Sequence, residues 1–154
     1  NPGRTITAAN LNLNARTGAI GSAAANGAID VAVTNLTVTT AGQNAYVTAT
    51  GAVNLGAGPS NLGAGGLNLA STGAITQSGV VTATGNSTFA AGAANNVTLT
   101  NAANDFGTVA VTSGNAVKGA GSRVARSRHG CRRTCATAGD DRGRGGAARC
   151  AGPP

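Results

Sequence analysis

Apolar and polar residues alternate with a period of two along most of the chain. Triplets in which one residue separates two aliphatic residues recur as far as residue 111: Leu11-Asn12-Leu13, Leu36-Thr37-Val38, Val53-Asn54-Leu55, Leu67-Asn68-Leu69, Val97-Thr98-Leu99 and Val109-Ala110-Val111. Successive side chains of a β-strand point to opposite faces, so this spacing predicts short strands whose first and third triplet residues face inward. In this register Leu69, Val97 and Leu99 are buried. Asn68 and Thr98 then lie outside.

The segments between the triplets are rich in Gly, Asn and Ala. Examples are Ala41-Gly42-Gln43-Asn44, Gly56-Ala57-Gly58-Pro59 and Asn101-Ala102-Ala103-Asn104-Asp105. Such residues favour turns. The i, i+3, i+4 spacing of an amphipathic helix is nowhere sustained. We therefore expect residues 5–117 to form strands separated by turns.

An internal sequence repeat indicates how these strands are arranged. Leu11-Asn12-Leu13 followed by Thr17-Gly18-Ala19-Ile20 recurs further along as Leu67-Asn68-Leu69 followed by Thr72-Gly73-Ala74-Ile75. The interval between the two copies accommodates two or three rungs of roughly 20–25 residues each, within the period range of solenoid proteins. The fold expected is all-β: a parallel β-helix (β-solenoid) of short rungs whose strands pair with the rungs above and below.

Composition supports a thin core. Residues 1–117 contain 26 Ala and 17 Gly but only 8 Leu, 11 Val, 4 Ile, 2 Phe and 1 Tyr, too few large side chains for an ordinary globular interior. The same residues include 16 Asn and 18 Thr, which can form hydrogen-bonded ladders between stacked strands. A β-sandwich is the main alternative, although it usually fills its core with larger side chains. Disorder is the other alternative, but it is usually associated with high net charge.

Charge divides the chain into two parts. The net charge of the whole chain is +7. In residues 1–117, Arg4 and Arg16 balance Asp30 and Asp105. Residues 118–154 hold Lys118 and eight Arg against Asp140 and Asp141, and only one large aliphatic residue, Val124. We expect a solenoid over 1–117 and a disordered, basic Arg/Gly-rich tail over 118–154. Because Ala, Gly, Arg and Pro have GC-rich codons, the tail is hypothesised to be translated out of frame.

The tail contains the residue types that could bind a metal or act as a nucleophile. His129, Cys131, Cys135 and Cys150 could supply four zinc ligands, but strong zinc motifs pair their ligands in two closely spaced knuckles. Cys135 with His129 as its base would need a third group and a rigid pocket. The adjacent Asp140 and Asp141 suit a solvated turn better than acid–base catalysis. We therefore assign no catalytic, cofactor-binding or metal-binding residues.

A Gly-rich stretch over residues 56–66 is superficially similar to a phosphate-binding loop. No Lys-Ser or Lys-Thr pair follows it, and the next run is Leu67-Asn68-Leu69 rather than the start of a helix. We expect this stretch to be a loop between rungs.

Several segments of the body resemble a known family. Gly73-Ala74-Ile75-Thr76-Gln77-Ser78-Gly79, residues 96–109 and Ala110-Val111-Thr112-Ser113-Gly114-Asn115 look like the degenerate repeats of filamentous-haemagglutinin-like surface adhesins of Gram-negative bacteria. Those adhesins are long right-handed parallel β-helices, exported by two-partner secretion or as autotransporter passengers. The resemblance covers about residues 5–117. It implies a secreted or cell-surface protein, an outer-membrane transporter as export partner, and host-surface glycans or proteins as ligands of the intact adhesin. It provides no catalytic residues to carry over.

The function expected is that of a non-catalytic shaft segment of such an adhesin. The alternative is nonspecific nucleic-acid binding through the tail, where Arg142-Gly143-Arg144-Gly145-Gly146 is RGG-like but lacks aromatic neighbours. No specific nucleic-acid partner is expected. A pectate-lyase-type enzyme would need clustered acids and a basic residue on one face, whereas the four charges of the body are spread out.

No apolar run reaches the roughly 20 residues of a membrane-spanning helix. The start at Asn1-Pro2-Gly3, without Met, indicates a piece of a longer protein.

Overall fold

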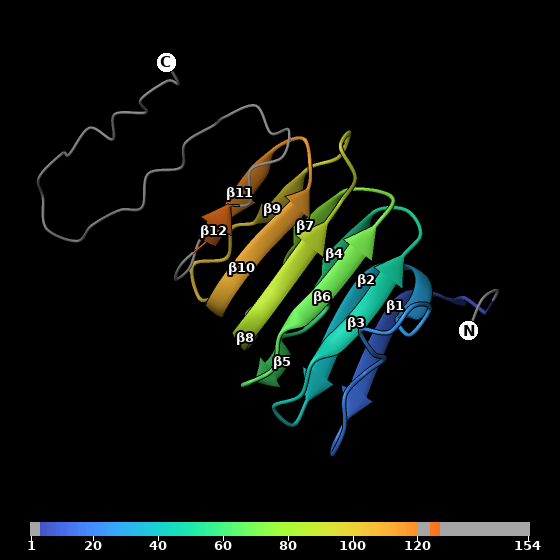
Figure 1. The fold of residues 1–154 in the computed structure, drawn as a ribbon. Helices are drawn as coiled ribbons and strands as arrows, with labels where there is room; N and C mark the ends of the chain where they lie inside the picture. The colour runs from blue at the N-terminus through green and yellow to red at the C-terminus, as the bar shows by residue number, and fades with distance from the viewer. Residues whose placement is uncertain (1–3, 120–123, 127–154) are drawn as a thin grey trace, which may run out of the picture.

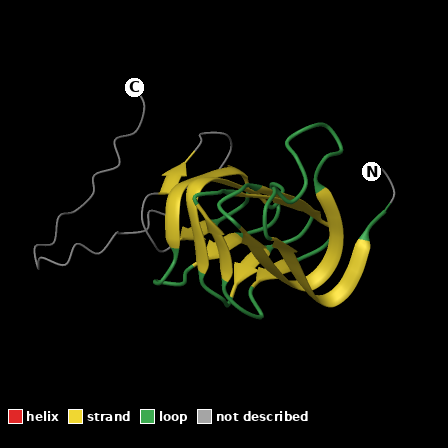
Figure 2. Cartoon of the chain, turned by 90° about the horizontal axis from the view of Figure 1, so that it is seen from below, coloured by secondary structure: helices red, strands yellow, loops and turns green. Residues whose placement is uncertain are grey.

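The chain forms a parallel β-solenoid of about five turns, as the alternating pattern predicted (Figure 1). The computed structural model describes residues 4–119 and 124–126. Within these residues the chain consists of strands, turns and loops only, as Figure 2 shows. Strands pair in parallel with strands of the neighbouring turns. The all-β class and the solenoid architecture are therefore confirmed.

Each turn contributes strand segments to three faces, which we number in the order in which the chain visits them. Face 1 contains the first parts of β1 (Ile6–Ala15) and β2 (Ile29–Thr40), then β3 (Ala45–Ala49), β6 (Leu67–Ser71), the second halves of β8 (Val81–Ala90) and β10 (Asp105–Ser113), and β12 (Val124–Arg126). Face 2 contains the middle parts of β1 and β2, then β4 (Val53–Leu55), β7 (Ile75–Gln77), β9 (Val97–Leu99) and β11 (Val117–Gly119). Face 3 contains the ends of β1 and β2, β5 (Ser60–Gly63) and the first halves of β8 and β10.

The structural repeat in the middle of the solenoid is one rung, for example residues 45–66. Ala45 pairs with Leu67, which begins the next rung on the same face, and Val53 pairs with Ile75 by the same step along the chain. This rung length lies within the range expected from the sequence. The two similar sequence segments from which this rung length was inferred, however, do not occupy equivalent positions in their rungs. Leu11 pairs on face 2, whereas its counterpart Leu67 pairs on face 1, because the interval between the two copies corresponds to about two and a half rungs rather than a whole number.

The inward register of the triplets is confirmed. Leu69, Val97 and Leu99 are 2%, 0% and 3% exposed, while Asn68 and Thr98 point outward and are half-buried between their neighbours in the ladder. Leu and Val fill most of the interior. The two Phe residues add the largest side chains: the rings of Phe89 and Phe106 meet edge to face, with centroids 6.1 Å apart. Backbone ladders and small side chains together account for a core with so few bulky residues.

The corners of the solenoid require glycine because successive rungs approach closely there. A Cβ added at Gly66 would overlap the backbone carbonyl oxygen of Asn86 in the next rung. At the corner between faces 2 and 3, Gly56 has a φ of 113° and its backbone lies directly against Gly79. No other residue type combines this conformation with this proximity. Much of the glycine content is therefore a requirement of the corners.

The Gly-rich stretch 56–66 was expected to be a loop, and this expectation was wrong for its central part. Ser60–Gly63 forms β5 on face 3. Ser60 and Leu62 are 1% and 0% exposed, and the hydroxyl of Ser60 accepts a hydrogen bond of 3.0 Å from the backbone N–H of Val38. A serine facing inward interrupts the apolar alternation, which is why the sequence pattern did not reveal this strand.

Strand pairing continues past the expected boundary at residue 117. β11 extends from Val117 to Gly119, and β12 pairs with β10 through Val109↔Val124, Ala110↔Ala125 and Val111↔Arg126. The remainder of the basic tail, including His129, Cys131, Cys135 and Cys150, lies outside the described residues.

Candidate functional site

An inserted loop breaks the regular outline of face 1. Ile20 pairs with Ala45, and Ile29 pairs with Val47. On β3, a single residue separates Ala45 from Val47. Their partners Ile20 and Ile29, in contrast, are separated by residues 21–28. Residues 21–28 therefore leave face 1 and return to it beside β3. Inside the loop, the N–H of Ser22 donates to the carbonyl of Gly27 at 2.8 Å. The loop therefore forms a closed protrusion at one side of β3.

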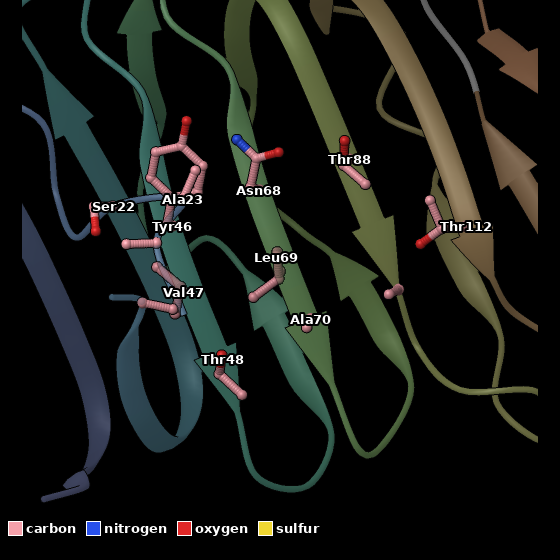
Figure 3. Close-up of a pocket in the computed structure, with 13 residues that line it drawn as sticks. Ser22, Ala23, Tyr46, Val47, Thr48, Asn68, Leu69, Ala70, Thr88 and Thr112 are labelled. Atoms are coloured by element: carbon pink, nitrogen blue, oxygen red, sulfur yellow. The ribbon is translucent and has the colours of Figure 1, made fainter. Parts of the chain in front are cut away.

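A groove of about 340 Å³ lies beside this loop (Figure 3). One wall is the loop, through Ser22, Ala23, Ala24 and Ala28. The floor is the outer surface of face 1, formed by Tyr46 and Thr48 of β3, Asn68 and Ala70 of β6, Thr88 and Ala90 of β8, and Thr112 of β10. The side chains of Tyr46, Asn68 and Thr88 come from successive strands at the same register position. The groove thus crosses the strands and follows the solenoid axis.

Four of the five polar side chains on the groove floor make no hydrogen bonds within the described residues. They are Thr48, Asn68, Thr88 and Thr112. Only Tyr46 has such a contact, because its hydroxyl accepts a hydrogen bond of 3.3 Å from the side-chain amide of Asn44. Small side chains, Ala70 and Ala90, lie between the hydroxyl and amide groups and leave them accessible. The groove therefore offers donors and acceptors together with one aromatic ring.

Face 2 differs from face 1 in this respect. The amide of Asn35 donates to the side-chain oxygen of Asn10 at 2.8 Å, and the amide of Asn54 donates to the side-chain oxygen of Asn35 at 2.8 Å. Asn54 also donates to the hydroxyl of Ser78 at 2.8 Å, and Thr76 donates to Asn54 at 3.4 Å. These side chains form a ladder along the axis, of the kind expected from the Asn and Thr content. Their hydrogen-bonding capacity stabilises the solenoid itself.

Among the described residues, no charged side chain lines the groove. The closest charge in the same register column is Asp30 of β2, which pairs with Thr48. Arg4, Arg16, Asp105 and Lys118 complete the charges in residues 4–119, and they lie away from the groove lining. The electrostatic environment is therefore neutral along the groove and negative at the β2 end.

None of the chemistry-bearing residues singled out from the sequence is among the described residues that line the groove. Within residues 4–119 and 124–126, no group of three or more His, Cys, Asp or Glu side chains lies together. The set His129, Cys131, Cys135 and Cys150, and the pair Asp140 and Asp141, lie outside the described residues. In the same described part of the chain, no helix has the length and apolarity needed to cross a bilayer.

The fold and its regular rungs define a repetitive β-solenoid protein. A protein family described as repeats of unknown function (DUF5649) matches residues 42–113, from the turn before β3 to the end of β10. This segment of the chain is therefore similar to that family, and it includes all of the groove floor. No curated protein and no solved structure matched the chain.

The groove was not anticipated from the sequence. Each rung contributes one or two outward residues, and these lie a whole rung apart in the chain, so no local motif marks them. One residue, Tyr46, could have indicated the groove from the sequence. It is the only tyrosine of the chain and occupies an outward triplet position, where the other strands have Asn, Thr or Ala.

Proposed function

We propose that the chain is a non-catalytic structural segment of a surface-exposed or secreted bacterial adhesin. The observation that supports this most is the stacking of similar rungs along a single axis, with ladders of backbone and side-chain hydrogen bonds between them. Such a solenoid gains length with each rung while keeping the same cross-section. Length without a change in width is what a shaft needs to hold a binding surface away from a cell.

The export route and partners belong to the same proposal. They rest on the resemblance of residues 5–117 to filamentous-haemagglutinin-like repeats. An outer-membrane transporter would secrete the protein, and host-surface glycans or proteins would bind the intact adhesin.

Antibodies raised against the recombinant chain test the location. They should stain intact cells of the source organism, and brief protease treatment of intact cells should remove the signal. Staining that requires permeabilised cells would overturn the proposal. An antibody against a cytoplasmic ribosomal protein, applied in parallel, shows whether the cells remained intact.

A further inference from the structure

We propose that the groove on face 1 binds a neutral, extended polysaccharide along the solenoid axis, with Tyr46 as its aromatic contact. This inference rests on the adhesin function and specifies its ligand class and binding face. Figure 3 shows the surface concerned, with Tyr46, Asn68, Thr88 and Thr112 on successive strands.

The hydrogen-bonding capacity of the groove fits a ligand rich in hydroxyl groups. Thr48, Asn68 and Thr88 have side chains without hydrogen bonds inside the described part of the chain. Each hydroxyl group both donates and accepts, and the amide of Asn68 provides both functions as well. Sugar hydroxyls have the same dual character, so they can replace the water that otherwise solvates these groups. On face 2 the corresponding Asn side chains already bond one another.

The apolar part of the groove fits the C–H groups of a sugar ring. Pyranose rings present C–H groups on one side, which pack against aromatic faces and methyl groups. Tyr46 lies at one side of the groove next to the loop, and the methyl groups of Ala70 and Ala90 lie along its floor. The two remaining aromatic residues, Phe89 and Phe106, are inside the solenoid. The only aromatic ring on the outer surface of the described residues is thus in the groove.

Spacing favours a polymer over a single sugar. Strands of neighbouring rungs lie about 4.8 Å apart. This distance is close to the length of one sugar unit in an extended β-1,4-linked chain. A polysaccharide parallel to the axis would therefore place one sugar unit on each of β3, β6, β8 and β10. Weak contacts repeated in this way add up to useful avidity.

Charge complementarity favours a neutral ligand. In the described part of the chain, no cation lines the groove to pair with a carboxylate or sulfate group, and Asp30 beside Thr48 repels anions at the β2 end. The basic tail attracts anionic polymers by a separate and salt-sensitive mechanism. High salt therefore separates the two modes of binding.

Isothermal titration of the full chain with cellohexaose, mannohexaose and hexa-N-acetylchitohexaose at high salt tests the proposal, with hexagalacturonate as the anionic comparison. We expect at least one neutral hexaose to bind, with amide shifts in NMR spectra centred on Thr48, Thr88 and Thr112, and no binding of hexagalacturonate. Failure of all three neutral hexaoses to bind at millimolar concentrations would overturn the proposal. Preference for hexagalacturonate, or shifts centred on face 2, would also overturn it.

Variants locate the binding site. Tyr46→Ala should weaken binding about fivefold to tenfold, whereas Tyr46→Phe, which keeps the ring, should bind nearly as well as the unmodified chain. Ala70→Gln puts a long neutral side chain into the groove and should abolish binding. Thr98→Gln makes a comparable change on face 2 and should have no effect. Circular dichroism confirms that each variant is folded. Equal affinity of Tyr46→Ala, Ala70→Gln and the unmodified chain for the bound hexaose would refute the groove as its site.

Two separate experiments distinguish failure of the groove proposal from failure of the proposed adhesin function on which its biological role rests. Antibody staining decides whether the chain is exposed on cells, and titration decides whether the groove binds neutral polysaccharides. A chain that binds hexaoses but resides inside cells would remove the proposed adhesin function and keep the groove.

Discussion

Individual residues of this solenoid stabilise it in two ways, through apolar side chains inside and amide side chains outside. The interior is narrow, so each large side chain fills a substantial part of one rung. Phe89 is fully buried and packs edge-on against Phe106 of the next rung. The outer ladder of face 2 connects rungs through Asn10, Asn35 and Asn54.

Phe89→Ala should lower the free energy of unfolding by about 3–5 kcal/mol, because it leaves a cavity between two rungs and removes the aromatic contact. Urea denaturation followed by circular dichroism measures this change. Thr108→Ala, at an exposed position of β10, is the control and should change stability by less than about 0.5 kcal/mol. A loss below about 1 kcal/mol for Phe89→Ala would mean that the rings do not hold the rungs together.

Asn35→Ala should destabilise the fold by about 1–2 kcal/mol, because Asn35 donates to Asn10 and accepts from Asn54. Asn12→Ala is the matched control, since Asn12 is exposed and its side chain makes no hydrogen bond within the described residues. The same urea titration compares the two. Equal losses of stability in both variants would show that the hydrogen bonds of the ladder do not stabilise the fold more than an exposed asparagine does.

At the scale of strands and corners, the pattern of side chains specifies the strands and glycine specifies how the chain turns between them. Gly66 precedes β6 at the corner between faces 3 and 1, where the backbone of Asn86 in the next rung leaves no room for a side chain. Gly58 lies in the loop before β5 and has no atom within 4 Å of an added Cβ.

Gly66→Ala should therefore destabilise the protein by about 1–3 kcal/mol or more, because β6 must move away from β8 to accept the methyl group. Gly58→Ala should be close to neutral. Melting temperatures of the two variants measure the contrast. Similar melting temperatures of the two variants would indicate that the corner accommodates the methyl group without loss of stability.

The sequence predicted the strands and their inward residues well, and it predicted the arrangement of the rungs less well. Triplets such as Val97-Thr98-Leu99 have a local period of two that directly reflects burial. The alignment of rungs depends on which residues turn corners and on the insertion 21–28, which makes the step from β1 to β2 longer than the step from β3 to β6. β5 was missed because Ser60 replaces an aliphatic residue. The groove was missed because it combines residues from four strands and a loop.

At the scale of the whole molecule, nearly neutral rungs and a basic tail are expected to act independently. Residues 127–154 contain six Arg against two Asp, whereas residues 4–119 contain three basic and two acidic residues. Only the tail can release many counterions when it binds a polyanion.

Truncation after Arg126 keeps β12 and removes most of the tail charge. We expect the truncated chain to retain the circular dichroism spectrum of the full chain and to lose binding to labelled oligonucleotides at low salt. Binding by the full chain should be indifferent to base sequence and should decline steeply with salt. Tight, sequence-specific binding at physiological salt would show that the tail is a genuine nucleic-acid module, and it would contradict its proposed out-of-frame origin.

The parallel ladders between rungs also determine how the molecule responds to force. Their backbone hydrogen bonds point along the solenoid axis, so a pull applied to the two ends opens them one row at a time rather than shearing all of them together. Each rung that unwinds, such as residues 45–66, releases about 70 Å of extended chain in place of a rise of about 5 Å. A solenoid built in this way would lengthen under tension and rewind when the tension falls, and in the proposed adhesin this would protect an attached cell against sudden drag.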